Sequence, residues 1–217
     1  LPAVEQLKSL VQKTCENHQL NFNELRTFST PRRLAVQIQG LPEKQEDRSI
    51  ELKGPPAAIA KDKDNHWTKA ALGFAAKNGV EPAELQIREY EGKDYLFVQR
   101  IELGQPVPEL LQAQLEQWIS QLNFPKNMRW ASYKMRFIRP IRWIVSLWNK
   151  TVVPLKLEMV EAGNETRGHR FLSSGKSLLK DAADYQEQLE KMNVMPDYEK
   201  RRESIVSQIS KLEQEFG

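Results

Sequence analysis

A two-residue turn between two apolar runs is the feature that most limits how this chain can fold. Residues 141–148 are mainly apolar and aromatic, and residues 153–159 alternate apolar with polar side chains. We expect a buried strand at 141–148, a turn at Asn149–Lys150 and a second strand at 153–159. A parallel crossover needs a dozen or more residues, so this pair of strands must be antiparallel.

Periodicity along the rest of the chain predicts helices and short strands in no regular alternation. Helical spacing occurs in residues 1–20, 69–78, 106–122, 181–193 and 196–216. Strand patterns occur at residues 34–38 and 50–52 and in a hairpin of residues 86–91 and 94–103, whereas residues 161–175 are expected to form a loop. Regular βαβ units are absent, so we predict an α+β fold with mostly antiparallel sheet and packed helices.

Composition excludes several classes of site. The 217 residues include one cysteine, so an internal disulfide and a cysteine zinc site are both excluded. We expect Cys15 to be ordinary packing. No P-loop, dinucleotide-binding or nucleophile-elbow motif occurs, and no apolar run is long enough to cross a membrane. The chain begins at Leu1 without a signal-peptide pattern, so we expect a cytoplasmic protein that is a fragment of a longer one.

Basic and aromatic residues alternate in a segment that has no acidic residue. Between residues 117 and 157 there is no Asp or Glu. The basic residues there are Lys126, Arg129, Lys134, Arg136, Arg139, Arg142, Lys150 and Lys156, and the aromatic residues among them are Trp130, Tyr133, Phe137, Trp143 and Trp148. Such a segment suits nucleic acid, because cations neutralise phosphates and rings stack on exposed bases. It equally suits core aromatics beside a solvated basic face, and composition does not decide between the two.

Two shorter clusters carry further arginines. Residues 166–171 read Thr-Arg-Gly-His-Arg-Phe, so Arg167, His169 and Arg170 flank a glycine and are able to hold an anion. The alternative is a loop whose arginines pair with Glu161 or Glu165. Arg32 and Arg33 precede the strand at 34–38 and should project to opposite sides if extended, one structural and the other facing a partner.

These clusters also carry a family resemblance. The chain resembles the N-terminal portion of the β subunit of bacterial glycyl-tRNA synthetase. The resemblance rests on segments in the family's order, namely Phe-Ser-Thr-Pro-Arg-Arg-Leu-Ala-Val at 28–36, Lys-Gly-Pro at 53–55, Lys-Ala-Ala-Leu-Gly-Phe at 69–74, Met-Arg-Trp at 128–130, Arg-Phe-Ile-Arg-Pro-Ile-Arg-Trp at 136–143 and the cluster at 166–171.

The resemblance implies a ligase that joins glycine to its tRNA using ATP and Mg²⁺. In this α2β2 enzyme the α subunit carries the class II active site, and the β subunit is needed for tRNA recognition. The N-terminal part of β is similar to the editing-type module of the phenylalanyl-tRNA synthetase β chain. We therefore expect such a module at residues 1–193 and the start of a helical domain at 194–217, with glycine tRNA, the α subunit and the remainder of the β chain as partners.

With this resemblance, the basic clusters become candidate tRNA contacts. The candidates are Arg32, Arg33, Arg129, Arg136, Arg139, Arg142, Arg167, His169 and Arg170. No residue is assigned to catalysis or to a metal, and ATP and Mg²⁺ are expected in the α subunit. Two alternatives remain, a scaffold that contacts no tRNA and a residual hydrolase acting on mischarged tRNA, for which no nucleophile–base pair is visible.

Overall fold

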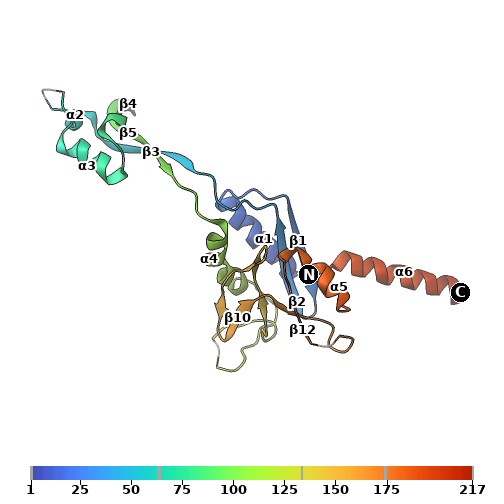
Figure 1. The fold of residues 1–217 in the computed structure, drawn as a ribbon. Helices are drawn as coiled ribbons and strands as arrows, with labels where there is room; N and C mark the ends of the chain where they lie inside the picture. Colours follow the sequence, from blue (N-terminus) through green and yellow to red (C-terminus); the bar gives the residue numbers. More distant parts are fainter. Residues whose placement is uncertain (1, 63–64, 133, 174, 217) are drawn as a thin grey trace. The chain divides into compact units, whose positions relative to one another are not determined.

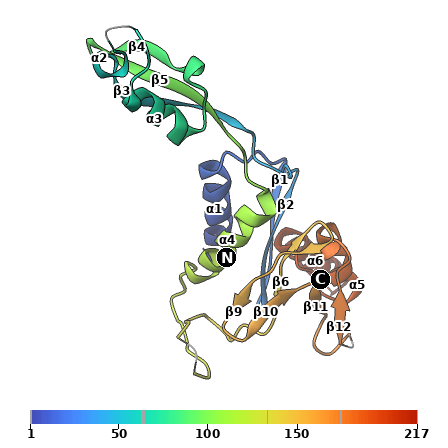
Figure 2. The ribbon, with the colours of Figure 1, turned by 60° about the vertical axis from the view of Figure 1, so that its left-hand side comes forward.

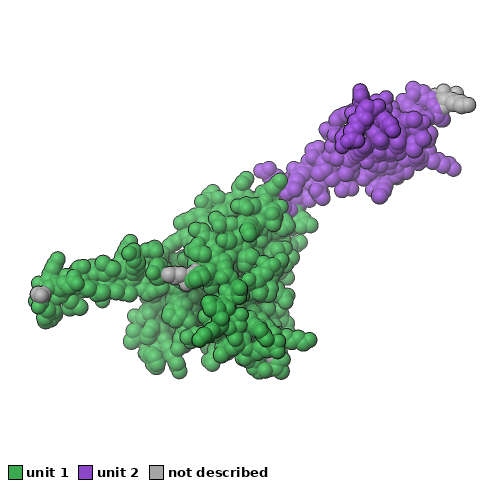
Figure 3. Space-filling model, turned by 180° about the vertical axis from the view of Figure 1, so that it is seen from behind, with its two compact units in different colours: residues 1–43, 105–217 green, residues 44–104 purple. Residues whose placement is uncertain are grey.

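The chain forms two compact units in the computed structural model, which describes residues 2–62, 65–132, 134–173 and 175–216. Unit 1 contains residues 1–43 and 105–217, and unit 2 contains residues 44–104 (Figure 3). Unit 2 is thus inserted into the sequence of unit 1. The fold is α+β, as predicted, with small sheets and several helices. Every described strand pair is antiparallel except the pair between β10 and β6.

Two helices and a hairpin make the core of unit 1 (Figure 2). The elements are α1 (Pro2–Asn17), β1 (Glu24–Thr30), β2 (Arg33–Gln39) and α4 (Val107–Ser120). Val11 and Cys15 of α1 are fully buried beside Trp118 of α4, whose indole Nε1 donates a hydrogen bond to Thr14 Oγ1 at 2.9 Å. The helices and the strand at β2 confirm the predictions, and Cys15 packs in the core as expected. Strand β1 was not predicted.

Short strands follow α4. They are β6 (Ile144–Val145), β7 (Leu147–Trp148), β8 (Thr151–Val152), β9 (Lys156–Leu157), β10 (Val160–Gly163), β11 (Glu165–Arg167) and β12 (Lys176–Leu178). β6, β10 and β9 form one sheet, while β7 pairs with β8 and β11 pairs with β12. The turn at Asn149–Lys150 is confirmed, and the strands that flank it are antiparallel, with Leu147 opposite Val152. The second strand predicted over residues 153–159 is wrong, because only Lys156 and Leu157 form a strand there, and that strand pairs with β10.

The prediction of one buried strand over residues 141–148 is wrong. Ser146 interrupts that strand, since its N–H donates to the carbonyl of Gly163 and its carbonyl accepts from the N–H of Val153. The chain therefore changes partner at Ser146, and the residues on either side are only half-buried. The loop predicted over residues 161–175 is also wrong in part, because it contains most of β10 and all of β11.

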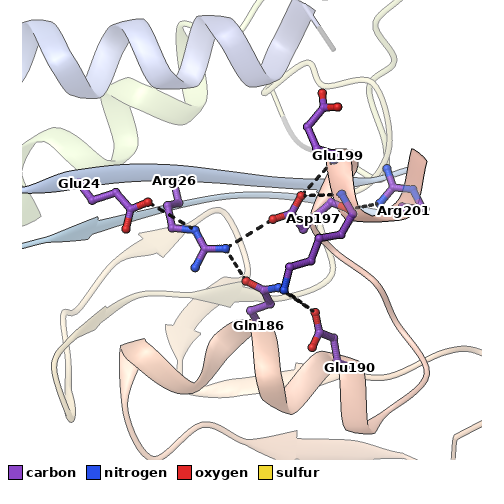
Figure 4. Close-up of polar contacts among 8 residues, drawn as sticks. Glu24, Arg26, Gln186, Glu190, Asp197, Glu199 and Arg201 are labelled. Atoms are coloured by element: carbon purple, nitrogen blue, oxygen red, sulfur yellow. Dashed lines mark hydrogen bonds and ion pairs between the residues drawn. The ribbon is translucent and has the colours of Figure 1, made fainter. Parts of the chain in front are cut away.

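A polar network joins the C-terminal helices to the hairpin. The elements are η2 (Ala182–Asp184), α5 (Tyr185–Lys191) and α6 (Tyr198–Phe216). The Arg26 guanidinium of β1 donates to Gln186 Oε1 of α5 at 2.6 Å and to Asp197 Oδ2 at 3.4 Å (Figure 4). Asp197 Oδ1 accepts from the N–H groups of Glu199 and Lys200, so this carboxylate caps α6. One arginine therefore orders both helices against β1.

Unit 2 is a three-stranded antiparallel sheet with helices on one face. Its elements are β3 (Arg48–Pro56), α2 (Ala57–Ala60), α3 (Lys69–Asn78), η1 (Pro82–Glu84), β4 (Gln86–Tyr90) and β5 (Lys93–Glu102), in the sheet order β3-β5-β4 (Figure 1). Leu96 and Val98 pack against Ala71 and Ala75 of α3. The hairpin and the helix at 69–78 were predicted. Gly79 ends α3 in the left-handed conformation that glycine favours.

The domain boundary that we expect near residue 194 stays a prediction. The insertion at residues 44–104 was not anticipated from the sequence pattern. Among the described residues, no helix is both long and apolar enough to cross a membrane.

Candidate nucleic-acid interface

Arg33 is half-buried, whereas its neighbour Arg32 is exposed. Arg33 Nη2 donates to the backbone carbonyls of Arg167 and Gly168, the latter at 3.0 Å. Burial lowers the pKa of this guanidinium, and the charge of Arg32 lowers it further. The two residues are not both extended as expected, because Arg32 lies in the turn between β1 and β2 and only Arg33 belongs to a strand. Arg33 positions the 167–168 backbone, and Arg32 is the member of the pair that is free to meet a partner.

Two guanidinium groups lie over one tryptophan ring. The Cζ atom of Arg33 is 5.6 Å from the centroid of Trp143, and the Cζ atom of Arg167 is 5.3 Å from it. Both distances are in the range of a cation–π contact. The Nε atoms of both arginines are buried and have no hydrogen-bond partner among the described residues. Trp143 thus gathers side chains from β2 and β11 at one point of unit 1.

A pocket of about 250 Å³ opens beside this cluster. Its wall includes Arg142, Trp143, Arg167 and Lys176 together with Glu161 and Glu165. Lys176 lies directly opposite Arg167 in the β11–β12 pair, and its ammonium is 2.7 Å from a carboxylate oxygen of Glu165. The pocket therefore brings together arginines from two of the predicted clusters, and it adds a lysine that the sequence reasoning missed. No sequence motif surrounds Lys176, so its place in this pocket could be found only from the pairing of β11 with β12.

The turn that follows β11 holds His169 firmly. The backbone N–H of His169 donates to the carbonyl of Met192 at 2.9 Å. The ring nitrogen Nδ1 accepts from the backbone N–H groups of Phe171 and Leu172 at 3.3 and 3.2 Å. A ring nitrogen that accepts carries no proton, so Nε2 bears the proton of the neutral imidazole. Phe171 is 82% exposed, and the exposed Arg170 lies 5.4 Å from the centroid of its ring.

In the basic segment between α4 and β6, the ring of Phe137 packs against the core of unit 1. Phe137 pairs through its backbone with Met128, and its ring packs 4.7 Å from that of Phe124 at the edge of the core. Arg129 and Arg136 are the residues next to this pair, and both are exposed. Arg139 and Arg142 are exposed as well. Within the described part of the chain, the residues that line the pocket do not include Arg129, Arg136 or Arg139.

Most aromatic residues of that segment are structural. Phe137 and Trp148 pack against the core of unit 1, and Trp143 carries the two guanidinium groups. Trp130 is half-buried. Tyr133 lies outside the described residues. The expectation that these rings alternate with the arginines as stacking surfaces therefore finds no support at Phe137 and Trp148.

Acidic partners do not neutralise the candidate arginines. Glu161 pairs with Lys156 at 3.0 Å, and Glu165 pairs with Lys176. Across residues 2–62, 65–132, 134–173 and 175–216, none of the nine candidate residues forms an ion pair. In the same ranges, no group of three or more His, Cys, Asp and Glu side chains is placed to hold a metal ion.

Known sequences place this arrangement in a family. The model of the family described as "Glycyl-tRNA synthetase beta subunit" matches residues 1–217. The chain belongs to the glycyl-tRNA synthetase beta subunit family. It is 44% identical over 214 residues to the glycine–tRNA ligase beta subunit of Desulfitobacterium hafniense (strain DSM 10664 / DCB-2), covering 99% of this chain and 31% of that protein. It is 45% identical over 219 residues to that of Picosynechococcus sp. (strain ATCC 27264 / PCC 7002 / PR-6), with the same coverage.

The family resemblance expected from the sequence is thereby confirmed. A third relative, the glycine–tRNA ligase beta subunit of Lactiplantibacillus plantarum (strain ATCC BAA-793 / NCIMB 8826 / WCFS1), is 42% identical over 214 residues and again has 31% of its length covered. The chain thus spans about a third of the length of these beta subunit relatives.

Proposed function

We propose that this chain contributes tRNA binding and subunit architecture to a glycine–tRNA ligase, and that it does not form the adenylate. The proposal is supported by the way Arg142 and Arg167 line one pocket beside Trp143, where neither guanidinium forms an ion pair with a carboxylate of the described residues. Unpaired guanidinium groups favour a polyanion, because they bind phosphate bidentately and release its counterions. Glycine tRNA is the polyanion that the relatives' names indicate.

The contact residues that we propose are the exposed ones. They are Arg32, Arg129, Arg136, Arg139, Arg142, Arg170 and, at the pocket wall, Arg167. His169 contributes its Nε2 proton as a donor to a phosphate or ribose oxygen, since Nδ1 is held by the backbone. Arg33 supports this surface from behind through its bonds to the 167–168 carbonyls.

A salt titration tests the proposal. The change Arg139→Gln with Arg142→Gln should weaken tRNA binding and reduce the slope of log K against log salt by roughly 0.7–0.9 for each phosphate that the protein no longer neutralises. The matched control is Arg202→Gln, which removes an exposed arginine of α6 that pairs with Glu199. An affinity and a slope equal to those of the unchanged chain would contradict the proposal.

The architectural part of the proposal rests on α6. This helix exposes Ile205, Val206, Ile209 and Leu212, each at least half exposed. A row of apolar side chains at helical spacing favours packing against another element, and we propose the remainder of the β chain as that element. In the full-length subunit, Ile205→Glu with Ile209→Glu should lower the melting temperature. In contrast, Gln208→Glu on the same helix should leave it unchanged.

The other parts of the assignment are proposals from the family. From the family we also propose that ATP and Mg²⁺ bind the α subunit of an α2β2 enzyme in the cytoplasm. The likeness of residues 1–193 to the editing-type module of the phenylalanyl-tRNA synthetase β chain stays a prediction. A pure scaffold would not bind tRNA but would co-purify with the α subunit or with the missing β segments in a pulldown. A residual hydrolase would deacylate mischarged tRNA in the absence of ATP.

A further inference from the structure

In the part of unit 2 that the structure describes, the helices pack on one face of the sheet and no helix or strand covers the other. Side chains alternate between the faces of a strand, and Leu52, Leu96 and Val98 pack on the helix side. Residues of the opposite parity therefore share the other face. The strand register confirms this, because Lys53 lies opposite Phe97, and Arg88 lies opposite Tyr95.

Three aromatic rings and a lysine occupy that uncovered face. The Nζ atom of Lys53 is 3.8 Å from the ring centroid of Tyr90 and 3.8 Å from that of Tyr95. The two tyrosine centroids are 6.3 Å apart, and the ring of Phe97 is 6.4 Å from Tyr90. Phe97 is buried beneath the others, whereas Tyr90 is 44% exposed. We call Lys53, Tyr90, Tyr95 and Phe97 the tyrosine platform.

Charge is distributed unequally between the two faces. Residues 44–104 contain ten Lys and Arg and eleven Asp and Glu, so unit 2 as a whole has no basic excess. The platform face nevertheless carries Lys53, Arg88 and Lys93 by strand parity, and its only acidic strand residue within the described chain, Glu51, is paired with Arg88. Glu89 and Asp94 lie opposite one another on the helix side. The uncovered face is thus locally cationic on a unit that is otherwise slightly acidic.

We propose that the tyrosine platform binds single-stranded RNA. Unpaired bases stack on Tyr90 and Tyr95, and the ammonium groups of Lys53 and Lys93 contact the phosphates between them. Rings that alternate with cations on the open face of an antiparallel sheet match both parts of a nucleotide, the flat base and the charged linkage. A duplex keeps its bases stacked internally, so only an unpaired strand offers both. The site lies in a different unit from the arginines of the proposed function and does not rest on them.

Fluorescence anisotropy with a labelled oligouridylate of about ten nucleotides tests this site, because the probe is short enough for one platform. With the whole 217-residue chain, Tyr90→Ala and Tyr95→Ala should each weaken binding by about fivefold to a hundredfold. Tyr90→Phe should retain it, since the ring remains. Lys53→Gln should reduce the salt slope by roughly 0.7. Tyr198→Ala, which removes an exposed tyrosine of α6, is the matched control and should change nothing.

A second measurement locates the contact directly. Oligouridylate that carries 4-thiouridine should crosslink to Tyr90 or Tyr95 under long-wave light, and Arg142→Gln should leave this crosslink unchanged. The proposal is overturned if the folded alanine variants bind the probe as the unchanged chain does, or if Arg142→Gln alone abolishes binding. Loss of α-subunit binding in Tyr90→Ala, with unchanged RNA affinity, would also overturn it by assigning the platform to a protein partner.

Discussion

Arg33 Nη2 donates a hydrogen bond to the backbone carbonyl of Gly168 at 3.0 Å, across 135 positions of the sequence. The same nitrogen donates to the carbonyl of Arg167, and the guanidinium also lies over Trp143. One side chain therefore ties the start of β2 to the turn after β11. The exposed groups of that turn, Arg170 and Phe171, depend on this tie for their position.

Replacing Arg33 should destabilise unit 1 more than its partial exposure suggests. We expect Arg33→Ala to lower the free energy of unfolding by about 2–3 kcal/mol, because two half-buried carbonyls lose a charged donor. Lysine cannot reproduce the forked geometry, so Arg33→Lys should recover little of this loss. Urea unfolding measures both. Arg32→Ala is the control, and its free energy of unfolding should stay within about 0.5 kcal/mol of that of the unchanged chain. An equal loss in Arg32→Ala would show that the hydrogen bonds from Arg33 to the 167–168 carbonyls do not cause the destabilisation.

Gly168 should not tolerate a side chain. A Cβ atom at this position would meet the Ser173 hydroxyl and would lie 2.7 Å from Met192 Cβ. We expect Gly168→Ala to cost about 1–3 kcal/mol in thermal unfolding, as overpacking does. Gly73 in α3 has open space around its Cβ position, so Gly73→Ala should instead stabilise unit 2 by about 0.5–1 kcal/mol.

The network around Asp197 predicts different effects for two substitutions. Asp197→Ala removes the cap of α6 and the partner of Arg26, and should cost about 1–2 kcal/mol. Asp197→Asn keeps an oxygen for the cap, so its cost should be smaller. Hydrogen exchange at the amides of Glu199 and Lys200 checks this directly (Figure 4). Equal exchange rates in the two variants would show that the charge contact with Arg26, and not the cap, orders the helix start.

Tyr185 should make stability depend on pH at alkaline values. Burial raises its pKa to about 12 from an ordinary value of 10.0, and the positive charge of Arg33 opposes the rise. The folded state therefore holds this proton more tightly than the unfolded state. The stabilisation is complete below pH 10 and is lost as the pH rises from 10 to 12, by at most about 1.4 kcal/mol per pH unit.

Difference measurements isolate this effect from the titration of lysines. The unchanged chain should lose stability relative to Tyr185→Phe between pH 10 and 12, and tyrosinate absorbance should show one phenol that ionises after the rest. Parallel stability curves for the two proteins would contradict the prediction.

Local patterns predicted the elements that have one clear periodicity. The helices at 69–78 and 107–120 and the hairpin of β4 and β5 fall close to the expected positions, because apolar spacing and glycine turns specify them without distant partners. Strand β1 was missed because its residues, Glu-Leu-Arg-Thr-Phe-Ser-Thr, show no apolar alternation, and its hairpin contact with β2 makes it a strand.

The candidate site was predictable only in part. The sequence pointed to Arg142 and Arg167 separately, and the pairing of β11 with β12 is what adds Lys176 to them. The different exposure of Arg32 and Arg33 does not follow from strand alternation, because Arg32 lies in the turn that precedes β2. The structural roles of Phe137 and Trp148 could not be foreseen, since an aromatic ring in a basic segment looks the same whether it faces the core or solvent.

The insertion of unit 2 sets the order in which the chain can complete its structure during synthesis. The contacts of residues 44–104 are all available once Gly104 has left the ribosome, and Asp47 Oδ1 then accepts from the N–H of that glycine. Val11 and Cys15 must wait for α4, since Trp118 covers them from the far side of the insertion. Strands β1 and β2 already contact α1 before the insertion is made, but the face of α1 that packs on α4 stays uncovered while residues 44–104 are translated. Nascent chains should therefore be most vulnerable to aggregation and to proteases at lengths between these two points.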